Sequence, residues 1–378
     1  MYKKVISLAA FSLCIYSAHV LADITVGISL SLTGPAASAA ASQKNTLPLL
    51  PGKIANIPVH YVVLDDATDT TTAVTNARKF VVDNKVDVII GSTATPGSLA
   101  ISNIAAEAKT PQIALAPFDV PSEKEIWSFK TPPSFPLVAR VVTEDMTRRK
   151  VKTIAFLGFS DALGEVWLNA IRKVAEANNI KLLVVERYGR TDNSVLAQVL
   201  KIISANPDAV VVGATSAAAA LPQLTLKEKG FKGLIYHTHA TATPEFLKMA
   251  GMKAEGALMP VVLPVVAEQL PGSHPSKAAA LDFVRAYEGK YGPRSRTNFA
   301  THLWDAALLL ETAIPMALEK AKPGTAEFRA ALRDALEHIK DKAVTNGIVT
   351  MSANDHYGYD ERALALVEVR NGEFILFK

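Results

Sequence analysis

The sequence predicts an α/β protein with two Rossmann-like lobes, each built on a mainly parallel sheet, joined by a multi-strand hinge. Short β-branched runs alternate with amphipathic helical stretches, a pattern typical of βαβ units. The alternation occurs twice, over residues 24–117 and again over 151–239. Between these blocks, residues 131–136 contain three prolines. Because proline interrupts helices and central strands, we expect the chain to cross from one lobe to the other there.

The expected strands are apolar for most of their length, as strands are when helices cover both faces of a sheet. Stretches with helical periodicity separate them. In the first lobe the strands are 24–30, 60–65, 86–90 and 112–116, with helices at 72–83 and 98–108. In the second lobe the strands are 153–159, 181–187, 209–212 and 234–238, with helices at 167–178, 194–205 and 221–229.

The C-terminal part is expected to be shared between the lobes. Helices at 276–291, 301–320 and 325–340 precede an antiparallel hairpin of 363–369 and 374–377, turned at Asn371-Gly372. We expect one lobe to contain residues 23–136 and about 270–344, and the other to contain about 137–269 and 345–378. Several crossings between two lobes would make a hinged protein with a cleft.

The first 22 residues have the pattern of a secretory signal peptide. Lys3 and Lys4 precede an apolar run, and the segment ends in Val20-Leu21-Ala22, so we expect cleavage after Ala22 and export to the periplasm. An alternative is a lipoprotein acylated at Cys14, but Leu13 is bulky where that motif has a small residue. Cys14 is the only cysteine, so the mature chain would have neither disulfides nor thiol chemistry.

Composition narrows the class of protein. The formal net charge is +4, and removing two lysines with the signal peptide leaves +2. Without a cluster of Lys and Arg, this balance argues against nucleic-acid binding. The mature length suggests two domains, and no segment beyond the signal peptide offers ~20 consecutive apolar residues for a membrane span.

The loops after the strands indicate where a ligand binds. In open parallel sheets, ligands bind beyond the carboxyl ends of the strands. Here those loops are rich in hydroxyl groups and glycine, and the loop 93–98 leads directly into a helix. The unpaired N–H groups and the positive dipole of a helix N-terminus suit a carboxylate. An alternative is that Thr95 or Ser98 only caps this helix.

No catalytic motif is present. The sequence lacks a Gly-x-Ser-x-Gly elbow, a His-Glu-x-x-His motif and a dinucleotide fingerprint, so we expect no enzymatic activity, no catalytic residue and no cofactor. The mature chain has no cysteine and no His-x-x-x-His spacing, which argues against a metal site. For His239 a surface position and a cleft position both stay open, and Asp355-His356 could belong either to a site or to a turn.

Over essentially the whole mature chain, the sequence resembles type I periplasmic binding proteins of the leucine/isoleucine/valine-binding family. The resembling stretches are 27–35 (GISLSLTGP), 65–69 (DDATD), 86–91 (VDVIIG), 110–116 (TPQIALA), 163–165 (LGE) and 304–305 (WD). This resemblance implies the substrate-binding component of an ABC uptake transporter. Its expected partners are a small carboxylate ligand and an inner-membrane permease, and it is expected to be monomeric.

The resemblance also implies ligand contacts. Thr95 matches the residue that binds the ligand carboxylate, and Ala116, through its carbonyl, and Phe118 match the contacts after the fourth strand. Leu163 stands where the family often has an aromatic residue. Thr33, in the loop after the first strand, is a further candidate. The expected ligand-binding residues are therefore Thr33, Thr95, Ala116, Phe118, Leu163, Thr215 and His239.

One of these positions departs from the amino-acid receptors of the family, which carry an acidic side chain where this chain has His239. A buried ammonium without that partner would be costly. Segments such as GSTATPGSLA and YHTHATATPEFL instead resemble the subgroup that binds aromatic acids such as benzoates. This implies a carboxylate at Thr95, a ring on Phe118 and a distal polar group at His239. The alternatives are an amino-acid receptor, with Asp119 pairing the ammonium, and a sensor for a membrane receptor.

Overall fold

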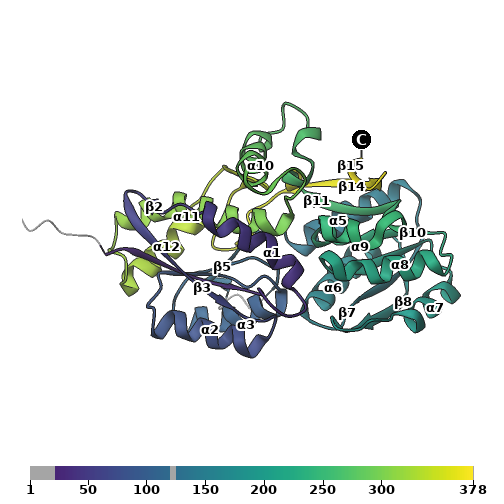
Figure 1. Ribbon diagram of the computed structural model, residues 1–378, viewed down its shortest axis with the longest axis horizontal. Coiled ribbons are helices and arrows are strands. Elements are labelled where there is room, and N and C mark those ends of the chain that lie inside the picture. The colour runs from purple at the N-terminus through teal and green to yellow at the C-terminus, as the bar shows by residue number, and fades with distance from the viewer. Residues whose placement is uncertain (1–21, 120–124, 378) are drawn as a thin grey trace, which may run out of the picture.

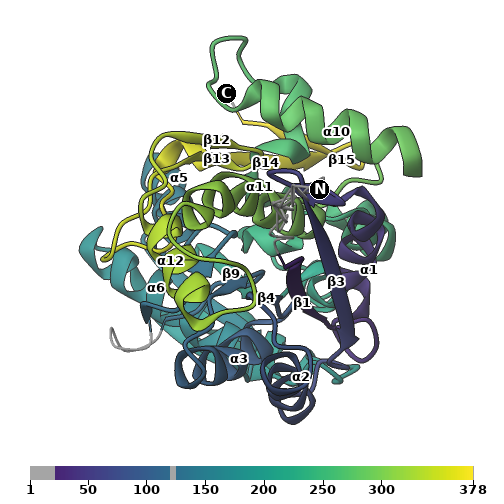
Figure 2. The same cartoon turned by 90° about the vertical axis from the view of Figure 1, so that its left-hand side faces the viewer.

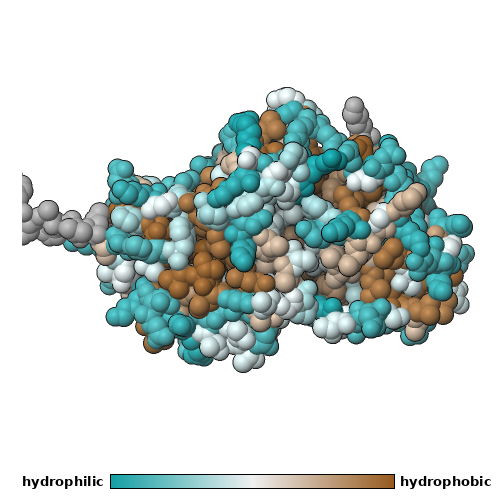
Figure 3. Space-filling model, in the orientation of Figure 1, coloured by the Kyte–Doolittle hydropathy of each residue, from teal (hydrophilic) through white to brown (hydrophobic). Residues whose placement is uncertain are grey.

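The computed structural model describes residues 22–119 and 125–377. The predicted signal peptide therefore lies outside the described residues, apart from Ala22. Two α/β lobes lie side by side along the longest axis of the molecule (Figure 1). Among the helices that the structure describes, none combines the length and the apolar character needed to span a bilayer. On the face shown in Figure 3, hydrophilic residues spread over both lobes and apolar residues form separate patches.

The first lobe is built on a six-stranded sheet of order β2-β3-β1-β4-β5-β6, in which only the β2–β3 pair is antiparallel. Helices α2 and α3 cover one face of this sheet and α11 and α12 the other (Figure 2). The strands are β1 (Ile24–Leu30), β2 (Lys53–Ile54), β3 (Ile57–Asp65), β4 (Val88–Gly91), β5 (Gln112–Ala114) and β6 (Ser128–Lys130). The helices are α1 (Ala37–Thr46), α2 (Thr70–Val82), α3 (Thr95–Glu107), α11 (Asn298–Leu318) and α12 (Ala326–Glu337).

The second lobe is built on a seven-stranded sheet of order β15-β14-β11-β10-β9-β7-β8. The strands β7 to β11 run parallel, while β14 and β15 are antiparallel to their neighbours. The strands are β7 (Thr153–Phe159), β8 (Lys181–Tyr188), β9 (Ala209–Gly213), β10 (Leu234–His237), β11 (Ala257–Val262), β14 (Leu364–Arg370) and β15 (Glu373–Leu376). The helices are α5 (Phe135–Arg148), α6 (Ala162–Ala177), α7 (Leu196–Ala205), α8 (Ala220–Glu228) and α9 (Pro244–Ala250).

The C-terminal part contributes to both lobes. After β11, the 3₁₀ segment η5 (Leu263–Gln269) packs on α10 (Lys277–Tyr291), and α11 and α12 then return to the first lobe. A short hairpin follows, formed by β12 (Lys342–Val344) and β13 (Gly347–Val349). Val349 at its end and Met351 just after it still pack in the core of the first lobe. Leu364 packs in the core of the second lobe. On this packing we propose that the last crossing lies at 352–363, later than the boundary at 344 that the sequence suggests.

The α/β class, the alternation of elements and the C-terminal hairpin agree with the predictions. The elements that the sequence pattern did not predict include α1, α5, β6 and β11. Helix α5 begins at Phe135, inside the proline-rich crossing, because Pro136 stands in its first turn, where a missing N–H breaks no helical hydrogen bond.

Candidate ligand-binding site

A narrow pocket lies between the lobes, among the loops that follow the carboxyl ends of strands in both sheets. Its residues come from the loop and helix after β4, the loop after β5, the start of α5, the loops after β8, β9 and β10, and helices α1, α6 and α11. They are Ala36, Ala39, Thr93, Ala94, Thr95, Leu115, Ala116, Pro117, Phe135, Leu163, Arg190, Thr215, His239, Ala240, Phe299 and His302.

The start of α3 supplies the first lobe's side of the pocket. The helix is capped by the backbone at Ala94, without a side-chain cap, so the alternative that Thr95 or Ser98 only caps this helix is wrong. Ser98 Oγ instead donates to the carbonyl of Ser92, at 2.8 Å. Because the first N–H groups of a helix have no intrahelical partner, those of Thr95 and Gly97 are suited to an anion.

The hydroxyl of Thr95 is already engaged within the first lobe. Its Oγ1 donates to the carbonyl of Pro117 at 3.0 Å, which links the loop after β4 to the loop after β5. A hydroxyl has one proton to donate. In this arrangement Thr95 positions the two loops, and on the first lobe's side of the pocket the backbone N–H groups at the start of α3 are the donors left for a carboxylate.

Thr33 and Phe118 do not line the pocket, in contrast to the expectation from the sequence. Thr33 is exposed, and its Oγ1 donates to Asp65 Oδ2 at 2.6 Å, so a carboxylate of its own lobe holds its hydroxyl. Phe118 is fully buried within the first lobe, with Lys130 Nζ 5.0 Å from its ring centroid. Its backbone N–H donates to the hydroxyl of Tyr357, which in turn donates to the carbonyl of Phe118.

The second lobe brings Leu163, Thr215 and His239 to the pocket. Leu163 lies in the first turn of α6, where Asp161 caps the helix by accepting from the backbone N–H of Leu163 at 3.0 Å. Thr215 follows β9 and His239 follows β10. With Thr95 and Ala116, five of the seven residues that we expected at the site line this pocket.

Arg190 is a lining residue that the sequence analysis missed. It follows the end of β8, and its Nε donates to Asp161 Oδ2 at 2.6 Å. Its guanidinium carbon lies 4.2 Å from the centroid of the Phe159 ring. Its Nη2 is buried without a hydrogen-bond partner among the described residues. Its position just after a strand, where ligands bind in such sheets, was the sequence signal that could have identified it.

His239 and His302 form a neutral pair at the pocket, with ring centroids 6.3 Å apart. Burial lowers the pKa of His239 to about 4. It also lowers the pKa of His302 to about 3, with the neighbouring His239 acting in the same direction and the backbone of Leu115 opposing it. Nδ1 of His239 and both ring nitrogens of His302 lack a partner of good geometry among the described residues, so they remain able to bond a ligand.

The acidic residues of the first-lobe loops have structural roles. Asp66 is buried and accepts hydrogen bonds from Ser29, Ser31 and Ser92, between 2.6 and 3.0 Å. No Asp or Glu is found among the described residues that line the pocket, where Arg190 carries the only formal charge. Within the described part of the chain, no group of three or more His, Cys, Asp or Glu side chains is placed to hold a metal ion.

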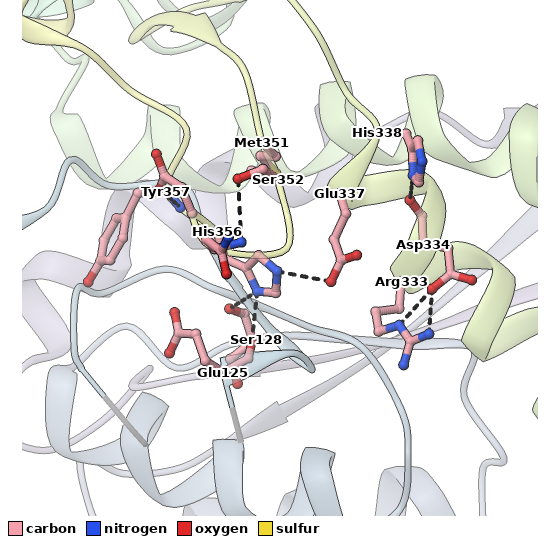
Figure 4. A network of polar contacts seen from close by, with 12 residues as sticks. Glu125, Ser128, Arg333, Asp334, Glu337, His338, Met351, Ser352, His356 and Tyr357 are labelled. Carbon is pink, nitrogen blue, oxygen red and sulfur yellow. Dashed lines mark hydrogen bonds and ion pairs between the residues drawn. The ribbon is translucent and has the colours of Figure 1, made fainter. Parts of the chain in front are cut away.

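His356 lies at the crossing to the second lobe and not at the pocket (Figure 4). Its ring stacks on Phe129 at 4.2 Å. Nδ1 lies 2.7 Å from the carbonyl of Glu125 and Nε2 lies 3.2 Å from Glu337 Oε1. Asp355 closes the turn by accepting from the backbone N–H of Tyr357 at 3.0 Å. The turn interpretation of these residues therefore fits their contacts.

The lobes lie close together around the pocket. Helix α3 contacts α6, and Ser38 Oγ donates to Ser216 Oγ across the cleft at 3.5 Å. The space left inside is about 20 Å³, enough for roughly one water. A larger ligand needs the lobes less completely closed, or a lining side chain displaced.

Two α/β lobes that meet over a pocket at the carboxyl ends of both sheets define a two-lobed solute-binding protein. The chain belongs to the periplasmic binding protein family, whose sequence profile matches residues 23–373. This confirms the predicted family and the type I fold. Members of the family are solute-binding receptors of transport systems, and the comparison with known members places this chain in their class.

Known proteins that resemble the chain come from several bacteria. An extracellular ligand-binding receptor from Rhodopseudomonas palustris HaA2 is 45% identical, with a TM-score of 0.93 over 94% of this chain and 100% of that one. The Leu/Ile/Val-binding protein homolog 3 of Brucella melitensis is 23% identical over 363 residues, 93% of this chain and 94% of that protein. A solute-binding protein of an ABC transporter from R. palustris, solved in complex with benzoate, is 19% identical. Its TM-score is 0.78 over 94% of this chain and 95% of that one.

Proposed function

We propose that the protein is the periplasmic substrate-binding component of an ABC uptake transporter and that its ligand is an aromatic carboxylate. The observation that carries the ligand class is the absence of an acidic side chain among the described residues of the pocket. The lobes would close around the ligand and present it to an inner-membrane permease.

An amino acid is disfavoured by this lining. An ammonium group that is buried without a carboxylate partner costs several kcal/mol. The charged side chain at the pocket is Arg190, and its partner Asp161 lies outside the lining, so the pocket offers no carboxylate to an ammonium. Asp119, the alternative partner, is exposed and lies outside the lining.

A carboxylate attached to an apolar ring is favoured. The N–H groups at the start of α3 would receive the carboxylate, as argued above. Phe135 and Phe299 provide the aromatic walls that the sequence assigned to Phe118. Flat rings pack well against aromatic side chains in offset or edge-to-face arrangements. His239 and His302, neutral at neutral pH, would bond a polar substituent on the ring without adding charge. The benzoate complex of the R. palustris protein shows that the same fold holds such a ligand elsewhere.

A thermal-shift screen tests the ligand class. Benzoate and ring-substituted benzoates are compared with leucine, isoleucine and valine. A ligand at a hundred times its dissociation constant adds roughly 2.7 kcal/mol of stability, which raises the melting temperature measurably. We expect a shift with at least one aromatic acid and none with the amino acids. A shift with leucine or valine alone would make the protein a branched-chain amino-acid receptor.

A further inference from the structure

Arg190 lines both the ligand pocket and a second cavity on the outside of the second lobe. The outer cavity has a volume of about 330 Å³, against about 20 Å³ for the pocket. Its lining includes Tyr188, Ala217, Leu221 and Met249. Within the described chain, Arg190 is the one residue that lines both spaces.

The side chain of Arg190 is held in place from one side. Asp161 accepts from its Nε, and the ring of Phe159 lies under its guanidinium group. Nη2 has no partner among the described residues. The backbone beneath it is fixed by a turn, in which the N–H of Gly189 donates to Asp192 Oδ2 at 2.7 Å. The side chain can therefore swing away only by giving up both contacts, while the loop backbone stays in place.

We propose that Arg190 is the end wall of the ligand pocket and sets the length of ligand that the protein accepts. This rests on the proposed function, because it takes the aromatic carboxylate as the ligand. With the carboxylate at the start of α3 in the first lobe, the other end of the ligand points toward the second lobe, where Arg190 lies. Once the lobes open enough to admit it, a ligand that stops short of Arg190 leaves the Asp161 ion pair intact.

A longer ligand has to displace the wall. The side chain would swing outward, lose its contacts with Asp161 and Phe159, and join the two spaces. The outer cavity can receive the extension, because it includes apolar side chains such as Leu221 and the half-exposed Met249, whose flexible side chain adapts to different shapes. The energy lost at the ion pair is what discriminates against long ligands.

Removing the wall should therefore extend the ligand range. The variant Arg190→Ala joins the pocket to the outer cavity, and Arg187→Ala is its matched control. Arg187 lies in β8, just before the loop that carries Arg190. It pairs with Glu165 at 2.5 Å and lines neither cavity, so its removal changes the charge equally. Benzoate and biphenyl-4-carboxylate serve as the short and long probes, measured by calorimetry. We expect Arg190→Ala to raise the affinity for the biphenyl acid relative to benzoate at least tenfold, and Arg187→Ala to leave the ratio as in the wild type.

Asp161→Asn provides a second variant in case Arg190→Ala folds poorly. The amide oxygen can still accept from the first turn of α6, as Oδ1 does now, while the charge that holds Arg190 is lost. The ratio should rise here too, by less than in Arg190→Ala. An unchanged ratio in both variants, or an equal rise in Arg187→Ala, would overturn the proposal.

The two proposals fail in different ways. If the wild type binds neither acid, the ligand class is wrong. The wall is then supported only if Arg190→Ala or Asp161→Asn gains binding of the biphenyl acid while Arg187→Ala does not. If no variant binds either acid, both proposals are wrong.

Discussion

His239 and His302 show how burial shapes the chemistry of single residues at this site. Both rings are buried at the pocket, and burial holds the pKa of each well below its usual range. At neutral pH they contribute hydrogen-bonding nitrogens and no charge. An ionised pair at this distance would repel each other and the guanidinium of Arg190.

This burial predicts an acid-sensitive stability. The pKa of His302 is about 3 in the folded protein, against about 6.5 when unfolded. The unfolded chain therefore binds more protons between these values, and the free energy of unfolding falls as the pH falls below about 6.5. When the pH is lowered from 7 to 5, the titration of His302 should lower the free energy of unfolding by about 2 kcal/mol.

Urea unfolding of the wild type and of His302→Gln at the two pH values checks this, since glutamine does not titrate. Asp305 in the same helix has the opposite effect on stability. Burial raises the pKa of its carboxyl to about 7, so its contribution to the free energy of unfolding falls as the pH rises from about 4 to 7. The difference between wild type and variant cancels this contribution. An equal loss in both proteins would contradict the prediction.

Single residues of the site were partly predictable. The loops after the strands, together with the family resemblance, were enough to find Thr95, Ala116, Leu163, Thr215 and His239 near the pocket, while their contacts with a ligand stay predictions. The same rule failed for Thr33, because Asp65, distant in sequence, holds its hydroxyl. The prediction failed for Phe118 because Lys130 packs on its ring and Tyr357 bonds its backbone carbonyl, which holds it within the first lobe. Phe299 and His302 were missed because a helix from the C-terminal part of the chain reaches the pocket.

At the scale of elements, the start of α6 depends on a glycine. A Cβ at Gly164 would lie 1.8 Å from the carbonyl oxygen of Phe159, the last residue of β7. Such an overlap forces the backbone to shift. The close approach positions Leu163 at the pocket and Asp161 behind Arg190, so the geometry of the site depends on it.

Gly164→Ala should therefore destabilise the protein by several kcal/mol, in the range of severe packing defects. Gly289→Ala is the matched control, because Gly289 is an exposed position within α10 and a Cβ there meets nothing within 4 Å. It should stabilise by up to about 1 kcal/mol, as alanine does in helices. Thermal unfolding of the two variants compares them, and similar melting temperatures would refute this account of the packing.

The elements that the sequence pattern missed have identifiable reasons. Helix α1 reads ASAAASQKNT and has no apolar stripe to reveal a helix. Strand β6 has only three residues. Strand β11 contains Pro260, which argues against a central strand, yet it lies between β10 and β14. Long, regularly patterned elements were predictable, and short or proline-containing ones depend on tertiary contacts.

At the scale of the whole molecule, two crossings between the lobes are tied together. Lys130 donates its backbone N–H to the carbonyl of His356 at 3.0 Å. Tyr359 donates its hydroxyl to the carbonyl of Thr131 at 2.9 Å. These contacts connect the start of the first crossing to the last one, so we expect the crossings to bend as one hinge.

Ligand binding should close this hinge from a ligand-free state that is more open than the arrangement described here. Each lobe carries part of the pocket, so both parts contact a ligand only when the lobes meet. Small-angle scattering should give a smaller radius of gyration with a saturating ligand from the screen than without one. An unchanged radius would indicate a cleft that is closed in both states.

The fold was predictable at this scale because the alternation of strands and helices repeats over most of the chain. The ligand class depends on a few loop side chains, and there the sequence pointed to His239 but not to Arg190. The central claim is thus that the pocket selects a carboxylate that lacks an ammonium group.

Calorimetry with 3-phenylpropionate and phenylalanine tests this claim most directly, because the two ligands differ only in the ammonium. We expect the wild type to prefer 3-phenylpropionate and His239→Glu to lower that preference at least tenfold, since an added negative charge in the pocket disfavours an anion more than a zwitterion. His338→Glu, an exposed position outside the pocket, should leave the ratio unchanged. Tighter binding of phenylalanine than of 3-phenylpropionate by the wild type would contradict the account.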